Sequence, residues 1–138
     1  MYPEHIVKPM RAELAEKGFA ELTTAEDVKS VLNKNEGTTL LVVNSVCGCA
    51  AGGARPGVLM SLQHTKKPDN CVTVFAGVDQ EATKTAREFL LPYPPSSPAI
   101  ALFKDGKIVH MLERHHIEGR SPQMIAQSLA MAYEQYCN

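Results

Sequence analysis

The chain has no tryptophan, and only 6% of its residues are aromatic. It also has no excess of either charge: 14 lysines and arginines stand against 15 acidic residues, which gives a net charge of −1. Without a basic run, nothing in the sequence indicates binding to nucleic acid or to an anionic membrane. No apolar run approaches the roughly 18 residues of a membrane-spanning helix. We therefore expect neither nucleic acid nor a membrane among its partners.

Cysteine is scarce as well, with four residues among 138. A chain of this length buries a core that needs no disulfide staples, and its N-terminal segment lacks the profile of a secretory signal peptide. We expect one globular domain over residues 1–138, in the reducing cytoplasm where stable disulfides are rare. Cys71 begins an apolar run and is predicted to be a buried strand residue. Cys137, next to the C-terminus, is either an incidental exposed thiol or an auxiliary thiol near a site.

Hydrophobic periodicity predicts an alternation of helices and strands. The expected elements are a helical N-terminal extension over 1–17, a short extended segment at 19–22, a helix over 24–33, a strand at 39–44, a helix over 49–64 interrupted at Pro56, a strand at 71–78, a helix over 80–91, strands at 99–103 and 108–112, and a helix from Ser121. Asp105 and Gly106 between two apolar runs predict a hairpin, so the last strand pair is antiparallel, whereas strands separated by helices pair in parallel. The sequence therefore predicts an α/β fold with a mixed central sheet flanked by helices.

Two cysteines separated by a single glycine, Cys47 and Cys49 around Gly48, follow the strand predicted at 39–44. A thiol at the junction of a strand and a helix lies near unpaired backbone N–H groups and the positive end of the helix dipole. Both favour the thiolate, which is the nucleophile in exchange chemistry. We therefore expect Cys47 to be the nucleophile, with a pKa below the value of about 8.5 for a free cysteine.

The spacing of the pair limits what Cys49 can do. Residues two apart on a helix are rotated by about 200° from each other, so a disulfide between these cysteines needs a non-helical loop, which Gly48 makes possible. So small a ring is expected to be strained and easily reduced, which favours exchange chemistry over strong reduction. Cys49 is predicted to resolve an intermediate formed on Cys47, and a helix-buried thiol is the alternative.

Further motifs follow the cysteines along the chain. They are Ala54-Arg55-Pro56, Ser97-Pro98, Lys104-Asp105-Gly106 and the segment Glu113-Arg114-His115-His116-Ile117-Glu118-Gly119-Arg120. With the cysteine loop and the order of elements, these motifs resemble a thioredoxin-like fold and, more narrowly, the bacilliredoxins, in which Cys-Gly-Cys replaces Cys-x-x-Cys. The resemblance implies a cis peptide bond before Pro98, lying against the cysteine loop. Leu41 departs from ordinary thioredoxins, which keep a buried acid at that position.

The resemblance also implies a function. Bacilliredoxins exchange thiols and disulfides on cytosolic proteins that carry bacillithiol, a cysteine–glucosamine–malate thiol, as a mixed disulfide. We expect S-bacillithiolated cytosolic proteins as partners, bacillithiol as a co-substrate and no cofactor. Cys47 would attack the bacillithiol sulfur and hold it, and a second low-molecular-weight thiol or Cys49 would then restore Cys47.

Substrate binding is expected to involve arginine. The malate of bacillithiol offers two carboxylates, which the planar fork of arginine binds well. Arg55 is the first choice for this contact because it is closest in sequence to the cysteines, followed by Arg114 and Arg120 after the hairpin. The expected supporting residues are Gly48, Ser97 and Pro98.

Two other functions use the same residues. A general protein disulfide isomerase or oxidoreductase has the same first chemical step at Cys47, so the sequence does not separate it from removal of bacillithiol. A metal-binding protein would use the cysteines with His115 and His116 as zinc or copper(I) ligands. No second paired-ligand motif is present, and we expect no metal. The sequence leaves open the protein substrates, the thiol that the host uses and the oligomeric state.

Overall fold

The computed structural model describes residues 2–138. Its elements in chain order are α1 (Glu4–Ala15), β1 (Ala20–Glu21), α2 (Ala25–Leu32), β2 (Thr38–Asn44), a π-helical turn η1 (Ala50–Ala54), α3 (Arg55–Ser61), β3 (Asn70–Phe75), α4 (Gln80–Phe89), β4 (Ala99–Lys104), β5 (Lys107–Leu112), α5 (Arg114–Ile117) and α6 (Pro122–Tyr136). The types and order of these elements confirm the prediction, apart from the short α5, which lies where a loop was expected.

The strands form one mixed sheet in the order β1-β3-β2-β4-β5. β1 and β2 run parallel to β3, as predicted. β4 is antiparallel to both β2 and β5, so the prediction that strands separated by helices pair in parallel is wrong for β4, which follows α4. Central β2 is buried at all seven positions, which explains its unbroken apolar run. The cysteine loop therefore leaves the sheet from the carboxyl end of its most buried strand.

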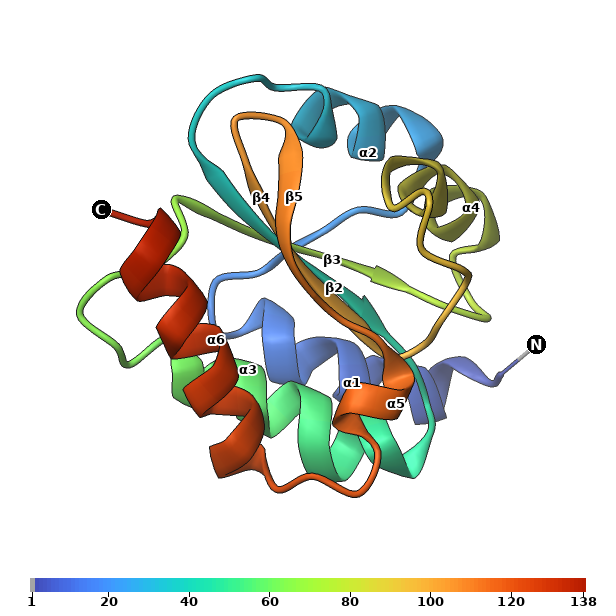
Figure 1. Cartoon of the computed structure of the whole chain (residues 1–138). Helices are drawn as coiled ribbons and strands as arrows, with labels where there is room; N and C mark the ends of the chain where they lie inside the picture. The colour runs from blue at the N-terminus through green and yellow to red at the C-terminus, as the bar shows by residue number, and fades with distance from the viewer. Residues whose placement is uncertain (1) are drawn as a thin grey trace.

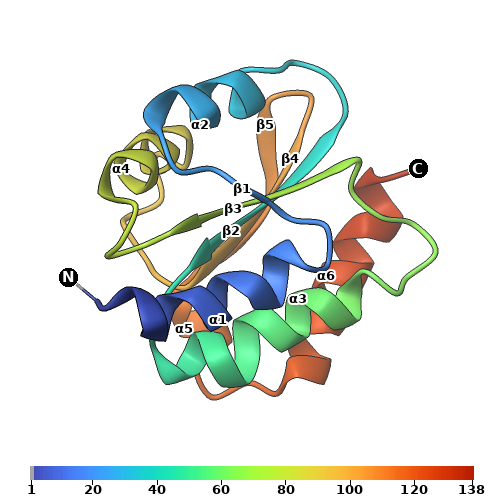
Figure 2. The same ribbon diagram turned by 180° about the vertical axis from the view of Figure 1, so that it is seen from behind.

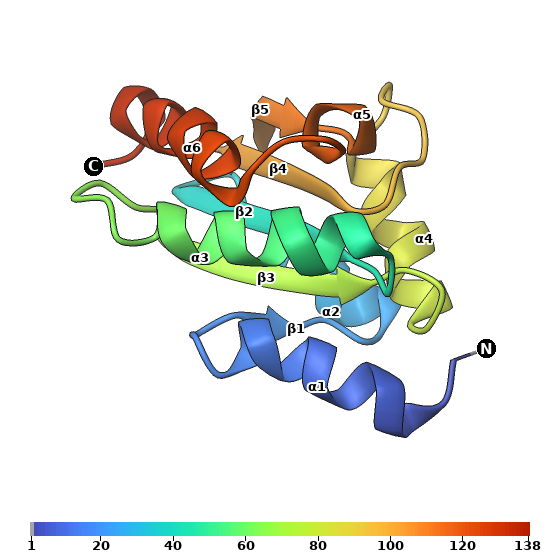
Figure 3. The same ribbon diagram turned by 90° about the horizontal axis from the view of Figure 1, so that it is seen from below.

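Helices cover both faces of the sheet (Figures 1 and 2). α1, α3 and α6 lie on one face and α2 and α4 on the other, and Figure 3 shows the first group in front of the sheet. Because side chains alternate along a strand, β2 supplies both cores. Leu40 and Val42 pack among α3 and α6, and Leu41 and Val43 pack among α2 and α4. Leu41, where thioredoxins keep an acid, is thus an apolar core residue.

Local capping fixes where two of the helices begin. The Thr24 hydroxyl accepts a hydrogen bond from the N–H of Asp27 at 3.1 Å, at the start of α2. Ser121 accepts one from the N–H of Met124 at 3.2 Å, ahead of Pro122 in the first turn of α6. Both caps satisfy N–H groups that have no partner inside the helix.

No helix within residues 2–138 combines the length and apolar character that crossing a membrane requires.

The structure corrects three predicted boundaries. The helix after the cysteines is irregular before Pro56 rather than at it, because the small residues of η1 form a wide π turn. Pro56 then occupies the first turn of α3, directly after η1. β3 ends at Phe75 instead of residue 78, ahead of a turn at Gly77 with φ of +82°. The next helix, α4, ends at Phe89, two residues earlier than predicted.

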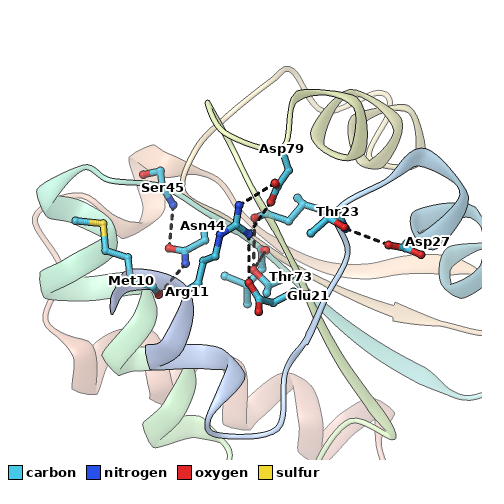
Figure 4. Close-up of polar contacts among 11 residues, drawn as sticks. Met10, Arg11, Glu21, Thr23, Asp27, Asn44, Ser45, Thr73 and Asp79 are labelled. Atoms are coloured by element: carbon cyan, nitrogen blue, oxygen red, sulfur yellow. Dashed lines mark hydrogen bonds and ion pairs between the residues drawn. The ribbon is translucent and has the colours of Figure 1, made fainter. Parts of the chain in front are cut away.

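The N-terminal helix is tied to the sheet by a polar cluster (Figure 4). Arg11 of α1 donates to both carboxylate oxygens of Asp79, each at 2.8 Å, and to Glu21 of β1 at 3.2 Å. Its guanidinium also lies 5.3 Å from the centre of the Phe75 ring. Two parallel charged hydrogen bonds fix orientation as well as distance. α1 is therefore part of the packed fold, and it reaches the end of the sheet where the cysteine loop begins.

Close packing of α3 on α6 gives a stability prediction. A Cβ at Gly57 would lie 2.7 Å from Cγ2 and 2.8 Å from Cβ of Ile125, whereas one at Gly52 would meet nothing within 4 Å. Gly57→Ala should therefore lower the free energy of unfolding by about 2 kcal/mol. Gly52→Ala, the matched control on the same helical segment, should leave it unchanged or slightly higher. Urea denaturation measures both, and equal stability of the two variants would contradict this packing.

Candidate active site

Cys47 lies at the point where the chain leaves β2 and turns into a helix. Gly48 and Cys49 are already helical, and the N–H groups of Ala50 and Ala51 donate to the Cys47 carbonyl at 3.1 and 3.2 Å. The Cys47 side chain is half-buried, so its sulfur is accessible from solution. The thiol thus lies at the amino end of the helical segment, as predicted from the sequence.

Hydrogen bonds and charge make Cys47 the more acidic thiol. Partial burial raises its pKa, but the Ser45 hydroxyl, backbone N–H groups and the positive charge of Arg114 outweigh burial, so the pKa is lowered overall. The Ser45 hydroxyl donates to the Cys47 sulfur at 3.2 Å, and the same oxygen accepts from the Cys47 N–H at 3.3 Å. Each of these groups stabilises a thiolate more than a thiol.

Cys49 has the opposite environment. Burial raises its pKa, and the negative charges of Cys47 and Glu118 raise it further. Its sulfur lies 3.6 Å from Oε2 of Glu118, a contact in which the protonated thiol is the donor. Glu118 also accepts from Nε of Arg114 at 2.9 Å, which keeps the carboxylate charged. The two pKa values therefore shift in opposite directions, so Cys47 ionises more readily than Cys49.

The structure corrects the assignment of Arg55 as the first choice for binding substrate carboxylates. Its side chain is only 1% exposed, and its Nε donates to Glu13 of α1 at 2.6 Å. Its Nη1 donates to Oδ1 of Asn44 and to the carbonyl of Ser45, both at 2.9 Å. All of these bonds lie beneath the cysteine loop. Arg55 therefore supports the loop from inside and does not face a ligand.

Asn44 and Ser45 belong to the same network. Asn44 donates from Nδ2 to the Met10 carbonyl at 3.3 Å, and its Oδ1 accepts from the Ser45 N–H at 2.9 Å (Figure 4). Both residues shortly precede the cysteines in the chain, and no role was predicted for their side chains. They position the Ser45 hydroxyl that bonds to Cys47.

The second loop of the site carries Ser97 and Pro98. The Ser97–Pro98 peptide bond is cis, which confirms the prediction, and Leu91–Pro92 is a second cis bond that was not predicted. Ser97 and Cys47 line one hollow of about 230 Å³, which places the Pro98 loop beside the cysteine loop. Arg114 donates from Nη1 to the Ser97 carbonyl at 3.3 Å and from its N–H to the Ser96 hydroxyl at 2.7 Å.

Of the three arginines predicted to bind substrate, the structure brings one to this hollow. Arg114 lines it, Arg55 is buried below it, and Arg120 is exposed but not among the lining residues. A fourth arginine, Arg87 of α4, lines the hollow as well. No motif marks Arg87, because only the packing of α4 against the sheet brings it near Cys47.

A metal site that joins the cysteines to the histidines is not assembled in residues 2–138. The group that could hold an ion there consists of Glu113, His115 and His116, without sulfur. Nδ1 of His116 already accepts from the Glu113 N–H at 3.0 Å as part of the cap of α5. The geometry therefore gives His116 a capping role beside the site.

The other two cysteines lie away from this site. Cys71 of β3 is half-buried, and burial raises its pKa to about 11. Cys137 is 4% exposed, which excludes the prediction of an incidental exposed thiol, and burial raises its pKa as well. Both pack in the core between the sheet and α6. They are protonated core thiols, poorly suited to attack a disulfide.

The environment of Cys47 predicts its pH profile. Only the thiolate is alkylated, so in wild type the rate should reach half its maximum at a pH below about 8.5, the midpoint of a free cysteine. Ser45→Ala removes a donor to the sulfur and should move this midpoint to higher pH. Ser30→Ala, on α2 at the opposite face, is the control and should not move it. Stopped-flow alkylation with iodoacetamide measures the profiles, and an unchanged midpoint in Ser45→Ala would contradict the assigned hydrogen bond.

Comparisons with known proteins agree with this site. A family model described as disulphide isomerase matches residues 2–137. The chain is 64% identical to a bacilliredoxin of Cytophaga hutchinsonii over 135 residues, covering 98% of this chain and 99% of the relative. It is 54% identical to a bacilliredoxin of Halalkalibacterium halodurans over 136 residues, covering 99% of this chain and 94% of the relative.

Solved structures show the same fold at low sequence identity. A putative oxidoreductase with a thioredoxin fold superposes with a TM-score of 0.61 at 16% identity, covering 85% of this chain and 95% of the other. Reduced thioredoxin of Schistosoma mansoni superposes with a TM-score of 0.56 at 16% identity, covering 84% of this chain and 98% of the other. The chain belongs to the bacilliredoxin family and is a thiol–disulfide oxidoreductase with a thioredoxin fold.

Proposed function

We propose that this protein removes bacillithiol from S-bacillithiolated proteins, with Cys47 as the nucleophile. The observation that carries the proposal is the opposite shift of the two thiols: the pKa of Cys47 is lowered and that of Cys49 is raised. A single activated thiol at an open hollow suits the capture of one small thiol from a mixed disulfide. The bacilliredoxin name of its relatives supports the choice of bacillithiol.

In the first step the Cys47 thiolate attacks the bacillithiol sulfur of the mixed disulfide. A bond forms between Cys47 Sγ and that sulfur while the bond to the target cysteine breaks. The target cysteine leaves as a thiolate and takes a proton from water. Backbone N–H groups and the Ser45 hydroxyl stabilise the negative charge of the Cys47 thiolate before attack. That charge is lost when Cys47 becomes part of a neutral disulfide. This step uses no metal or cofactor.

In the second step bacillithiol leaves Cys47 by one of two routes. The first restores the Cys47 thiolate directly, and the second leaves a disulfide that two further bacillithiol molecules must reduce. A second bacillithiol thiolate can attack the bacillithiol sulfur, which releases bacillithiol disulfide and the Cys47 thiolate. Cys49 can instead attack Cys47 Sγ, which releases one bacillithiol thiolate and leaves a Cys47–Cys49 disulfide. The internal route requires Cys49 to lose its proton, and the Glu118 carboxylate, 3.6 Å from the Cys49 sulfur, is placed to accept it. The raised pKa of Cys49 favours the external route at neutral pH.

Disulfide isomerisation is a second candidate function. The description of the matching family model favours it. It would begin with the same attack by Cys47, on a protein disulfide instead of a mixed disulfide with a small thiol. A reducing cytoplasm, the compartment we propose for this protein, offers few stable protein disulfides as substrates. Removal of bacillithiol is therefore the first choice.

Release of bacillithiol from a model protein tests the proposal. Wild type, Cys47→Ala and Cys49→Ala are each mixed with the bacillithiolated protein, with a glutathionylated form as substrate control. Cys71→Ala is the variant control, because that thiol lies outside the site. Intact mass spectrometry should show release by all variants except Cys47→Ala, and bacillithiol trapped on Cys47 in Cys49→Ala. We expect a rate at least tenfold higher than with the glutathionylated form.

Two results would contradict the proposal. Equal release from the bacillithiolated and glutathionylated proteins would exclude specificity for bacillithiol. Loss of release in Cys49→Ala with full release in Cys47→Ala would exchange the roles of the two thiols. Recovery of activity from scrambled ribonuclease, without release of bacillithiol, would instead support the isomerase.

A further inference from the structure

The hollow beside Cys47 continues toward α4. This hollow has a volume of about 230 Å³, and its lining includes Ser45, Cys47, Gly77, Arg87, Ser97 and Arg114. A neighbouring hollow of about 330 Å³ shares Gly77 and Arg87 with it and extends along α4 past Thr83 and Lys84. We call these two adjoining hollows, which have Gly77 and Arg87 in common, the groove. A small thiol with its sulfur at Cys47 has room to place the rest of its structure along this groove.

The groove is positively charged along its length. Arg87 and Arg114 line the part next to Cys47, and Lys84 stands at the far part. No aspartate or glutamate of residues 2–138 lines either part. The Glu118 carboxylate, which binds Nε of Arg114, stands outside the lining. An anionic group in the groove would therefore face three cationic side chains and no carboxylate of the lining.

Arg87 has unused hydrogen-bonding capacity. Its Nε is buried and has no hydrogen-bond partner in residues 2–138, and Oγ1 of Thr83, four residues earlier on α4, is in the same state. Arg11, Arg55 and Arg114, in contrast, each bond to a carboxylate. Buried polar groups are almost always paired, so Arg87 differs from these three arginines in having no acceptor for its Nε within residues 2–138. A planar guanidinium binds a carboxylate through two parallel bonds.

We propose that Arg87 and Arg114 form a carboxylate-binding subsite for the anionic end of the low-molecular-weight thiol that exchanges at Cys47. The subsite rests on the proposed function for the identity of that thiol, whose malate carries two carboxylates. Arg87 holds one carboxylate, and Arg114, whose Nε stays on Glu118, holds the other through its terminal N–H groups. The subsite selects the thiol by charge at a distance from the reacting sulfur.

Arg87 is a positioning residue in this scheme, distinct from a group that activates the nucleophile. The charge of Arg114 lowers the pKa of Cys47, but Arg87 is not among the groups that do so. Replacing Arg87 should therefore leave the reactivity of the Cys47 thiolate unchanged. It should weaken exchange only with disulfides that carry a carboxylate.

Small disulfides of different charge test the subsite without bacillithiol. The reduced protein is mixed with 5,5′-dithiobis(2-nitrobenzoate), which has two carboxylates, with neutral 2,2′-dipyridyl disulfide and with cationic cystamine. The phase that is absent in Cys47→Ala reports the exchange at Cys47. Arg87→Gln should slow the anionic probe by about tenfold and the neutral probe by less than twofold. Arg87→Lys, which keeps the charge but loses the fork, should fall between these values.

Lys29→Gln is the matched control, because it removes one exposed positive charge from α2, on the same face of the sheet as α4, at a position that lines neither hollow. It should change every rate by less than twofold. Equal slowing of all three probes in Arg87→Gln would overturn the subsite in favour of a general structural effect. Unchanged rates in that variant would overturn it as well.

A second arm separates the subsite from the proposed function. Wild type and Arg87→Gln are each mixed with a model protein that carries either bacillithiol or cysteinyl-glucosamine, which lacks malate, as the mixed disulfide. Wild type should prefer bacillithiol, and Arg87→Gln should lose most of that preference. Loss of the anionic-probe selectivity in Arg87→Gln, with no release of bacillithiol from protein by wild type, would support the subsite and contradict the proposed function. Release of bacillithiol that is indifferent to Arg87→Gln would contradict the subsite alone.

Discussion

The buried guanidinium of Arg55 joins three parts of the chain that the active site needs. It bonds to Glu13 of α1, to Asn44 at the end of β2 and to the Ser45 carbonyl in the cysteine loop, and its side chain is 1% exposed. A buried charge is tolerated only when it is paired and its donors are satisfied, so these partners are held in fixed positions. The same bonds fix Ser45, whose hydroxyl contacts Cys47. The acidity of the nucleophile therefore depends on packing between α1 and the sheet.

The two cysteines are close in sequence but differ in chemistry because their neighbours differ. Cys47 meets hydrogen-bond donors and the charge of Arg114, whereas Cys49 meets the carboxylate of Glu118. This division assigns attack to one thiol and leaves the other protonated. The arginines divide in a similar way: Arg55 is structural and buried, while Arg87 and Arg114 face the groove beside the sulfur. One end of the sheet thus combines an activated thiol with a cationic surface.

Local sequence patterns predicted the framework and the position of Cys47. Three of these patterns depend only on a few neighbouring residues: the apolar run of β2, the Asp-Gly hairpin and the capping residues. They can therefore be recognised from the sequence alone. Arg55 was misassigned because proximity in sequence says nothing about which way a side chain points. Arg87 was missed because tertiary packing alone brings α4 beside the cysteine loop. The roles of Asn44 and Glu118 likewise depend on partners more than 30 residues away.

The most direct test of this account is the pKa of Cys47 in Arg55→Met, measured by carbon NMR of labelled cysteine Cβ atoms. Amide spectra of the same samples establish that the variant is folded. The account predicts that the pKa, lowered in wild type, rises toward the ordinary value of about 8.5 in the folded variant, because the loop is no longer fixed. A folded Arg55→Met variant in which Cys47 keeps the pKa of wild type would contradict it.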